Sequence, residues 1–153
     1  MKILMSPSEV LGYFAPSEQL REELVSEYHI LLAQEKFLCP VLGQRVVERL
    51  CEGGYEEYVE EYLRQPLISL VRYLVLGEQM VTVGIQGVQQ YYGATSKPAS
   101  VEVVERLRRM LLSQAQTMLR RAVEHLDSYE ELRSIYVNDT SRSHTQIIGG
   151  VIL

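Results

Sequence analysis

The chain has 153 residues, of which 46% are hydrophobic and 23% charged, a composition typical of one globular domain with a sizeable core. Its formal net charge of −5 argues against general nucleic-acid binding, which requires a basic surface. No apolar run approaches the ~18 residues that span a membrane, and the N-terminus lacks the apolar core of a signal peptide, so we expect a soluble cytosolic protein.

Helical patterns open the chain. A short helix is expected from Ser6 to about Tyr13, because a proline and an acid follow a capping serine. A longer helix should begin near Ser17, where several glutamates favour the positive end of the helix dipole. Its apolar residues recur on one face as far as Phe37, and it should stop before Pro40 because the residue before a proline disfavours helix.

Three more helices are expected before the pattern changes. They cover residues 41–52, 55–64 and 67–80. Gly53 and Gly54 supply the left-handed conformation that ends a helix, and Pro66 opens the third of these helices. That third helix is apolar nearly all round, so we place it centrally in the core.

Residues 81–98 interrupt the helical pattern. From Val81 to Val88, β-branched residues alternate with smaller or polar ones, and two glycines weaken a helix. The polar run that follows is typical of a loop, and the whole stretch is too long for an ordinary helix connection. The sequence therefore predicts a protruding loop or a β-hairpin arm here.

The last third of the chain combines a long helix with an apolar tail. Ser100 caps a helix of about 28 residues, roughly 42 Å at 1.5 Å per residue. A short helix restarts at Asp127 and ends near Tyr136. The tail from Thr145 to Leu153 is apolar and β-branched, so it should pair with a strand of its own subunit or of a neighbour.

These elements predict an all-α protein. We expect a bundle of about five helices, a protruding loop or β-hairpin arm over 81–98, and a short C-terminal β-strand. The helical domain would span residues 1–136 and include the arm, and residues 137–153 would form an extended tail.

No residue pattern indicates catalysis, a metal or a cofactor. His29, His125 and His144 lack ligand partners at helical spacing. Cys39 and Cys51 match no zinc pattern, and we interpret them as small core residues in a reducing compartment rather than as a disulfide. Neither a G-x-S-x-G elbow nor a phosphate-binding G-x-x-x-x-G-K-[ST] loop occurs. We therefore expect no cofactor and no enzymatic activity.

Two charged faces are candidates for a contact between subunits. The acidic face consists of Glu56, Glu57, Glu60 and Glu61. The basic face, on the long helix, consists of Arg106, Arg109 and Arg120. Faces of opposite sign can set the register of a head-to-tail interface, whereas the plainer interpretation of the acidic run is a solvated helix surface. The neighbouring tyrosines at 55, 58 and 62 are more typical of a core than of an interface.

The apolar residues of the arm and tail are further interface candidates. In the arm they are Val81, Val83, Ile85, Val88, Tyr91 and Tyr92. In the tail they are Ile147, Ile148, Val151, Ile152 and Leu153. Since the arm is the other stretch with β-forming character, the tail should pair with it, either within one subunit or across to the next.

One stretch of sequence resembles a known family. Ala33-Gln-Glu-Lys-Phe-Leu-Cys-Pro-Val-Leu-Gly43, followed by Val46-Val-Glu-Arg-Leu50, is similar to the small head–tail connector proteins of tailed phages and prophages. Those proteins share an early helix, a Leu-Gly turn, a second short helix and a final long helix. The resemblance covers residues 17–126, and the Gly149-Gly150 tail matches no pattern of that family.

The resemblance implies a structural subunit without catalytic residues. It would form a homo-oligomeric ring below the portal and extend the DNA channel, contacting itself, the portal and tail-side phage proteins through loop 81–98 and tail 145–153. It implies neither sequence-specific nucleic-acid binding nor membrane association. The protein would be cytoplasmic during assembly and part of the virion of an active phage. The alternatives are another neck or tail-completion protein, or a small helical regulator that binds a protein partner, with an enzyme as the last.

Overall fold

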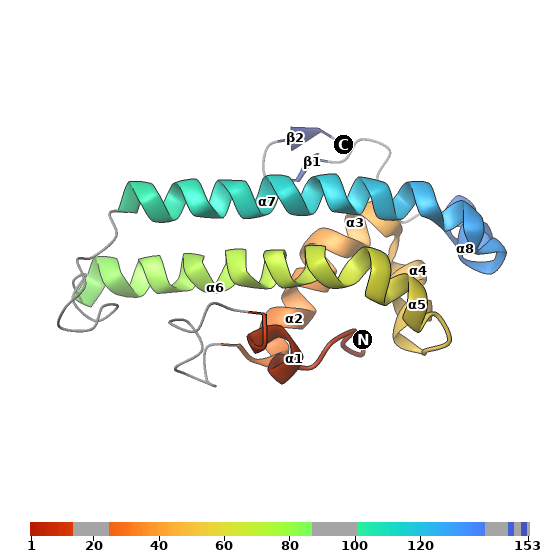
Figure 1. The fold of residues 1–153 in the computed structure, drawn as a ribbon, viewed down its shortest axis with the longest axis horizontal. Coiled ribbons are helices and arrows are strands. Elements are labelled where there is room, and N and C mark those ends of the chain that lie inside the picture. Colours follow the sequence, from red (N-terminus) through yellow and green to blue (C-terminus); the bar gives the residue numbers. More distant parts are fainter. Residues whose placement is uncertain (14–24, 87–100, 140–146, 149–150, 153) are drawn as a thin grey trace.

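A computed structural model describes residues 1–13, 25–86, 101–139, 147–148 and 151–152. Helices account for most of this described part, so the predicted all-α class is confirmed (Figure 1). The elements are α1 (Pro7–Leu11), α2 (Glu27–Ala33), η2 (Gln34–Leu38), α3 (Cys39–Leu42), α4 (Gln44–Cys51), α5 (Glu56–Tyr58), η3 (Val59–Leu63), α6 (Arg64–Gln86), α7 (Val101–Glu124), η5 (His125–Ser128), α8 (Glu130–Asn138), β1 (Ile147–Ile148) and β2 (Val151–Ile152).

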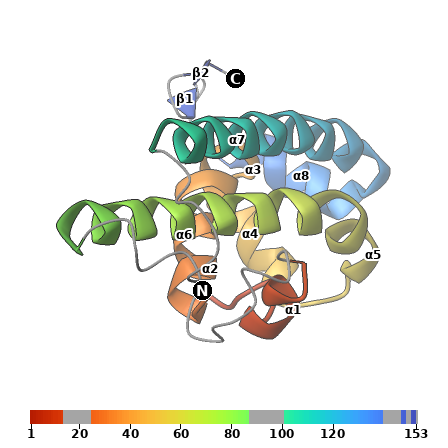
Figure 2. The same ribbon diagram turned by 60° about the vertical axis from the view of Figure 1, so that its left-hand side comes forward.

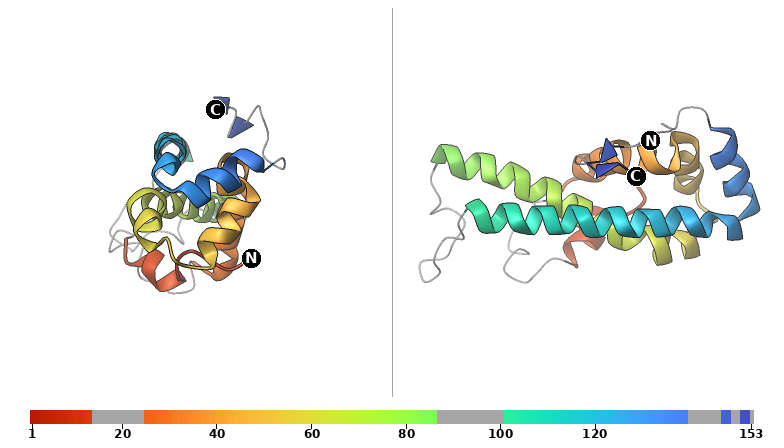
Figure 3. Two further views of the ribbon diagram at one scale, coloured as in Figure 1. Left: turned by 90° about the vertical axis from the view of Figure 1, so that its right-hand side faces the viewer. Right: turned by 90° about the horizontal axis from the view of Figure 1, so that it is seen from above.

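Uninterrupted runs join these elements into six helical rods within the described residues, against about five expected. Helices α6 and α7 form a long antiparallel pair and make the most extensive contact of the fold. The other helices gather along one part of this pair, so the end of α6 and the start of α7 project beyond them (Figures 1 and 3). We call this region, residues 76–86 and 101–110, the projecting end.

The hydrophobic core lies where α2, α3 and α4 pack beside the first half of α6 and the second half of α7. As predicted, α6 is central, since Leu67, Leu70 and Val71 are fully buried. The one fully buried amide side chain, among the described residues, belongs to Gln34. It accepts a hydrogen bond from the Leu4 backbone N–H (2.7 Å) and donates to the Lys2 carbonyl (2.9 Å), which holds the N-terminal segment against the core.

Two prolines fail to end helices where the sequence suggested they would. The helix containing η2 continues past Pro40 to Leu42, and the helix containing η3 continues past Pro66 into α6. In both cases a π-helical turn lies just before the proline: η2 and η3 are the π-helical segments of the described chain. A π-turn holds an extra residue, so it absorbs the missing N–H donor and the proline ring while the helix continues.

Other helix ends differ by smaller amounts. Residues 17–24 of the helix expected from Ser17 lie outside the described residues; within the described part, α2 begins at Glu27, after Ser26, its extended N-cap. The long helix has 24 α-helical residues and closes with the 3₁₀ turn η5, together covering the expected length. Gly53 and Gly54 both have positive φ (92° and 96°) after α4, as predicted.

The predicted arm is wrong over its first part. Val81, Val83 and Ile85 belong to α6, which continues as a helix to Gln86; the rest of the arm lies outside the described residues. Isolated glycines and β-branched residues cost a helix at most about 1 kcal/mol each, too little to break one that is already packed along α7. Residues 81–86 therefore offer no strand to the tail.

The C-terminal tail pairs with itself. Strands β1 and β2 are antiparallel, with Ile147 opposite Ile152 and Ile148 opposite Val151. The predicted β-structure of the tail is thus present as a two-stranded hairpin, and its expected pairing with residues 81–88 of the same subunit does not form over the described part. The hairpin lies on the side of α7 that faces away from α6 (Figures 1 and 2).

Candidate assembly surfaces

An aromatic cluster holds α5 and η3 against the end of α7 and the start of α8. The Tyr58 ring is fully buried and lies 5.2 Å from the Tyr129 ring and 5.3 Å from the Tyr62 ring, between centroids. Its hydroxyl donates to the Ala122 carbonyl of α7 (2.6 Å). Burial raises the pKa of Tyr58 well above its usual range, so the hydroxyl stays protonated as a donor. Tyr62 stacks on His125 at 4.6 Å.

A polar network covers this cluster from α4 and α8. The Arg49 guanidinium donates to both carboxylate oxygens of Glu131 (3.0 and 3.4 Å) and lies over the Tyr55 ring at 4.9 Å. Tyr55 also donates its hydroxyl proton to Glu131. The hydrogen bonds from Arg49, and then that from Tyr55, lower the pKa of Glu131 below its ordinary value of 4.5. We call α4, α5, η3, η5 and α8, joined in this way, the packed end.

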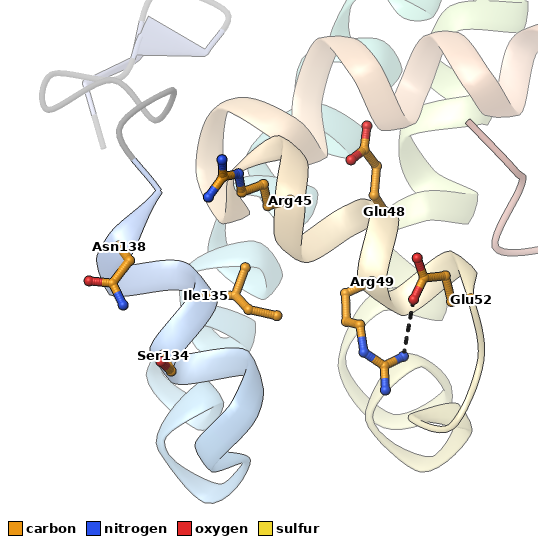
Figure 4. A pocket seen from close by; sticks show the side chains of 7 residues that line it. All are labelled: Arg45, Glu48, Arg49, Glu52, Ser134, Ile135 and Asn138. Atoms are coloured by element: carbon orange, nitrogen blue, oxygen red, sulfur yellow. Dashed lines mark ion pairs between the residues drawn. The ribbon is translucent and has the colours of Figure 1, made fainter.

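An open groove runs between α4 and α8 at the packed end (Figure 4). It has a volume of about 380 Å³ and is lined by Arg45, Glu48, Arg49, Glu52, Ser134, Ile135 and Asn138. Arg49 and Glu52 form an ion pair across its wall at 3.8 Å. Both signs of charge alternate along α4 here and a single apolar side chain faces them, so the groove lacks the apolar lining that small-molecule sites usually have.

The C-terminal end of α8 is attached to the start of α4 through one buried carboxylate. Asp139 is 6% exposed, and its Oδ2 accepts a hydrogen bond from the Arg45 backbone N–H (3.3 Å). Gly43, the N-cap of α4, has no side chain that could do this. Asp139 therefore caps α4 from 94 residues away, at the positive end of the helix dipole. A Cβ on Gly43 would lie 2.5 Å from Asp139 Oδ2, so the contact also requires the glycine.

The predicted acidic face is exposed at the packed end. All four of its glutamates lie at the surface of α5 and η3. Glu56 accepts the Gly54 backbone N–H (3.0 Å), which lowers its pKa, and Glu60 pairs with Arg64. Glu57 and Glu61 lie four residues apart on the same helical rod. All four carboxylates are exposed, and Glu61 also interacts locally, since partial burial and then the charge of Glu61 raise the pKa of the adjacent Tyr62.

The predicted basic face is divided by the structure. Arg106 and Arg109 are exposed at the projecting end. Arg120 lies two residues before Ala122, the α7 residue that is bonded to Tyr58 of α5. Arg106 and Ala122, the residue bonded to Tyr58, are separated by about 24 Å at 1.5 Å per residue. Arg106 and Arg109 are therefore far from the acidic face of their own subunit, and Arg120 is close to it.

Exposed apolar side chains accompany the two distant arginines. Among the described residues, three of the large hydrophobic side chains with high exposure lie in the first ten residues of α7: Val101 (57%), Val103 (51%) and Met110 (48%). Sequence reasoning missed them because valine and methionine near a long apolar stripe look like part of it. Only packing shows that these three side chains stay about half-exposed.

Arg108 ties α7 to α6 close to this face. Its guanidinium stacks over the Tyr73 ring at 4.2 Å, donates to the Tyr73 carbonyl (3.2 Å), and pairs with Glu105 (3.0 Å). It can approach because position 77 of α6 is glycine: a Cβ there would lie 2.6 Å from an Arg108 nitrogen. The carboxylate of Glu105 is engaged by Arg108 and not by Arg109.

The predicted apolar interface residues fall mostly at the limits of the described chain. Val81, Val83 and Ile85 lie on the last turns of α6, and Ile147, Ile148, Val151 and Ile152 lie in the hairpin. Val88, Tyr91, Tyr92 and Leu153 lie outside the described residues. The first group lies in a helix and the second in the hairpin, so the backbone does not bring the two groups into one strand ladder.

One polar constellation was missed from the sequence. The Ser26 backbone N–H donates to His29 Nδ1 (3.1 Å), the Ser26 hydroxyl lies 3.1 Å from the same nitrogen, and His29 Nε2 lies 2.8 Å from Glu78 Oε2. Since Nδ1 accepts an N–H, the ring proton lies on Nε2 and is donated to Glu78. Serine, histidine and a carboxylate also form hydrolytic sites, but here the Nδ1 lone pair completes a capping box that starts α2 and joins it to α6. The Ser-x-x-His spacing was the available signal.

The two cysteines are free and lie half-buried beside the core, as core residues would. Burial, with the nearby charge of Glu35, raises the pKa of the Cys39 thiol to about 11. Among the described residues, no group of three or more His, Cys, Asp or Glu is placed to hold a metal ion. Within the same residues, no helix combines the length and apolarity that crossing a bilayer would require.

Comparison with known families places the sequence in one of them. The model of a family of unknown function, DUF6712, matches residues 11–142, which is most of the chain. This chain belongs to the DUF6712 family. No curated protein and no solved structure matches it. The DUF6712 match runs from the last residue of α1 through α8, and therefore takes in the packed end, the projecting end and the Gly43–Asp139 contact, while the hairpin lies beyond it.

Proposed function

We propose that this DUF6712 protein is a structural subunit of a phage or prophage head–tail connector, which assembles with copies of itself into a ring at the portal vertex. The resemblance of residues 33–50 to small connector proteins motivates this function. In the structure this stretch is the rod from η2 to α3, the Gly43 turn and α4, and its last element, α4, belongs to the packed end. The stretch thus serves as scaffold, and the contacts of the ring are made elsewhere.

The observation that carries the proposal is the C-terminal hairpin. Its sequence is strongly apolar, and within the described chain its two strands pair only with each other, so each keeps one open edge. An open apolar edge is a template for a strand from another chain. Asp139, seated on α4, gives the tail a fixed origin on the subunit surface. A hairpin of this kind suits a contact from subunit to subunit or to the portal.

The regulator alternative has less support. It relied on the tyrosines of α5 and η3 as a binding face, and Tyr58 is fully buried with its hydroxyl bonded to Ala122. Tyr55 and Tyr62 pack against the core and against Tyr129 and His125. What remains exposed there is acidic, which fits an electrostatic contact better than an aromatic one.

Removing residues 145–153 tests the proposal. We expect the full chain to form larger species, measured by light scattering at high concentration or with the portal protein of the same particle, and the truncated chain to remain a folded monomer. Circular dichroism checks that the helices persist. A full chain that stays monomeric in low and high salt, with and without the portal protein, contradicts the proposal. A truncated chain that unfolds would show that the hairpin belongs to the core.

Gene order gives an independent test that needs no purified protein. A connector gene is expected directly after the portal and capsid genes, where head-completion proteins are encoded. A neck or tail-completion protein would instead lie among tail genes, and a regulator would lie outside the structural block. A position away from all virion genes contradicts the proposal.

A further inference from the structure

The outer side of α7 at the projecting end carries exposed apolar side chains among arginines. Val103, Arg106 and Met110 follow one another at spacings of three and four residues, so they form one stripe along the helix, with Arg109 beside it. Two of these side chains are apolar and half-exposed, and the arginines flank them. Apolar residues with arginine at a rim are typical of protein interfaces.

The charges of this stripe are not neutralised within the subunit. In the described part of the chain, no carboxylate lies within ion-pair distance of Arg106 or Arg109. The neighbouring Glu105 pairs with Arg108 instead. Arg109 makes only a long bond, 3.5 Å, to the Glu105 backbone carbonyl. The stripe therefore presents two guanidinium groups to whatever covers it.

The acidic face of α5 and η3 is the complementary surface, and it lies at the other end of the molecule. Glu57 and Glu61 are exposed there beside the half-buried Val59 and Tyr62. The stripe and this face are separated by most of the length of α7, so they do not meet within one subunit. They can meet only between copies, in a head-to-tail contact that either closes into a ring or continues as a filament.

We propose that the α7 stripe of one subunit, made of Val103, Arg106, Arg109 and Met110, docks on the α5–η3 acidic face of a second copy. This inference rests on the proposed function and names the joint between neighbouring subunits. Arg106 and Arg109 meet Glu57 and Glu61, while Val103 and Met110 cover the apolar surface around Val59. The contact sets register and direction through charge and gains most of its affinity from the apolar pair.

Charge reversal tests the joint. In the first variant, Arg106→Glu and Arg109→Glu reverse the stripe; in the second, Glu57→Lys and Glu61→Lys reverse the acidic face. Each variant alone should associate more weakly than the native chain, by roughly tenfold or more. A mixture of the two should associate again, because each reversed surface then meets a complementary one in an alternating assembly. Mass is measured by light scattering or native mass spectrometry.

Matched controls separate this contact from a general effect of charge. Glu27→Lys with Glu35→Lys changes the net charge by the same amount as the second variant, at exposed positions of α2 and η2 away from both surfaces, and should leave association unchanged. Val103→Ala with Met110→Ala removes the apolar part at exposed positions, so the fold should persist while association weakens. Circular dichroism verifies folding of each variant.

The outcomes distinguish this inference from the function it rests on. If the native chain assembles and neither reversal weakens assembly, or if the mixture fails to recover while both variants remain folded, the joint is wrong and the proposed function stands. A native chain that is monomeric in every condition, including with the portal protein, overturns both. Loss in each variant with recovery in the mixture supports the joint.

Discussion

The two ends of the molecule are built on opposite principles. At the packed end, buried Tyr58, the Arg49–Glu131–Tyr55 network and the Asp139 cap join four helical elements that are distant in sequence. At the projecting end, α6 and α7 pack mainly on each other, with Arg108 stacked on Tyr73 at its base and His29 of α2 bonded to Glu78. The first end concentrates stability, and the second leaves side chains exposed.

This difference suggests where substitutions will be felt. A residue that fills a site between several helices loses many contacts when it is removed, and its neighbours relax only in part. A residue on the outer side of a two-helix pair loses few. Substitutions in the second half of α7 should therefore mainly lower the free energy of unfolding. Substitutions on the outer side of its first half should mainly weaken association.

The largest effect is expected from Tyr58→Ala. It removes a fully buried ring from the centre of the packed end and should lower the free energy of unfolding by about 3–5 kcal/mol, measured by urea denaturation. Tyr58→Phe keeps the ring and loses the bond to the Ala122 carbonyl, at a cost of about 1 kcal/mol. Met110→Ala at the projecting end should change stability by less than about 0.5 kcal/mol. Equal costs for Tyr58→Ala and Met110→Ala would remove the distinction between the ends.

Gly43→Ala should be the next most damaging change. The residue has a φ of 92°, and the new Cβ would meet the Asp139 carboxylate, so strain and loss of the cap together should cost about 2–4 kcal/mol. Gly54→Ala is the matched control: its φ is 96°, but nothing lies within 4 Å of a Cβ there, so only the strain of about 1–2 kcal/mol applies. If the two variants are equally stable in thermal or urea unfolding, Asp139 contributes nothing to α4.

A double-mutant cycle measures the polar contact of the projecting end. In an Arg108→Ala background, Gly77→Ala should stabilise the protein by up to about 1 kcal/mol, because alanine favours helix. In the native background the same change displaces the guanidinium, and the gain should vanish or reverse. The difference between the two backgrounds in urea midpoint is the coupling. No difference would mean that Arg108 does not depend on the glycine.

The smallest effect concerns pH. Hydrogen bonds from Arg49 and Tyr55 lower the pKa of Glu131 in the folded state, so this group contributes stability above its unfolded value, near 4.5, and loses it as the pH falls through the folded value. The native chain should thus lose stability below about pH 4.5 more steeply than Glu131→Gln. Acid titration followed by circular dichroism compares them. Identical acid profiles would show that the network does not contribute at the packed end.

Much of the fold could be predicted because its signals are local. The periodicity of residues 101–124, the apolar character of 67–75 and the Gly53-Gly54 stop each depend on a few neighbouring residues, and the structure agrees with them. The helix breaks expected at Pro40 and Pro66 were wrong because the effect of a proline depends on the helical turn before it. Nothing in the composition of Gln34–Leu38 or Val59–Leu63 distinguishes a π-turn from an α-turn.

The surfaces were less predictable because they depend on distant pairings. The sequence identified the acidic and basic residues, but not that Arg120 lies at the acidic end and Arg106 and Arg109 at the other. It gave no sign that Asp139 would cap α4, since the two are 94 residues apart in sequence. Val81 to Gln86 were assigned to an arm because alternation and glycine resemble a strand, whereas packing of α6 along α7 decides the matter.

The Asp139 contact also makes the tail a tether with a known point of attachment. Ile147 lies eight residue steps after Asp139, which bounds the distance between them at about 29 Å, at no more than 3.6 Å per residue. Because the hairpin is held close to the subunit surface, it meets a neighbour bound at that surface at an effective concentration far above that of a free peptide. A weak strand pairing then suffices. Loosening the attachment, for example with Asp139→Ala, would lengthen the tether and dilute the hairpin without altering any residue that it presents.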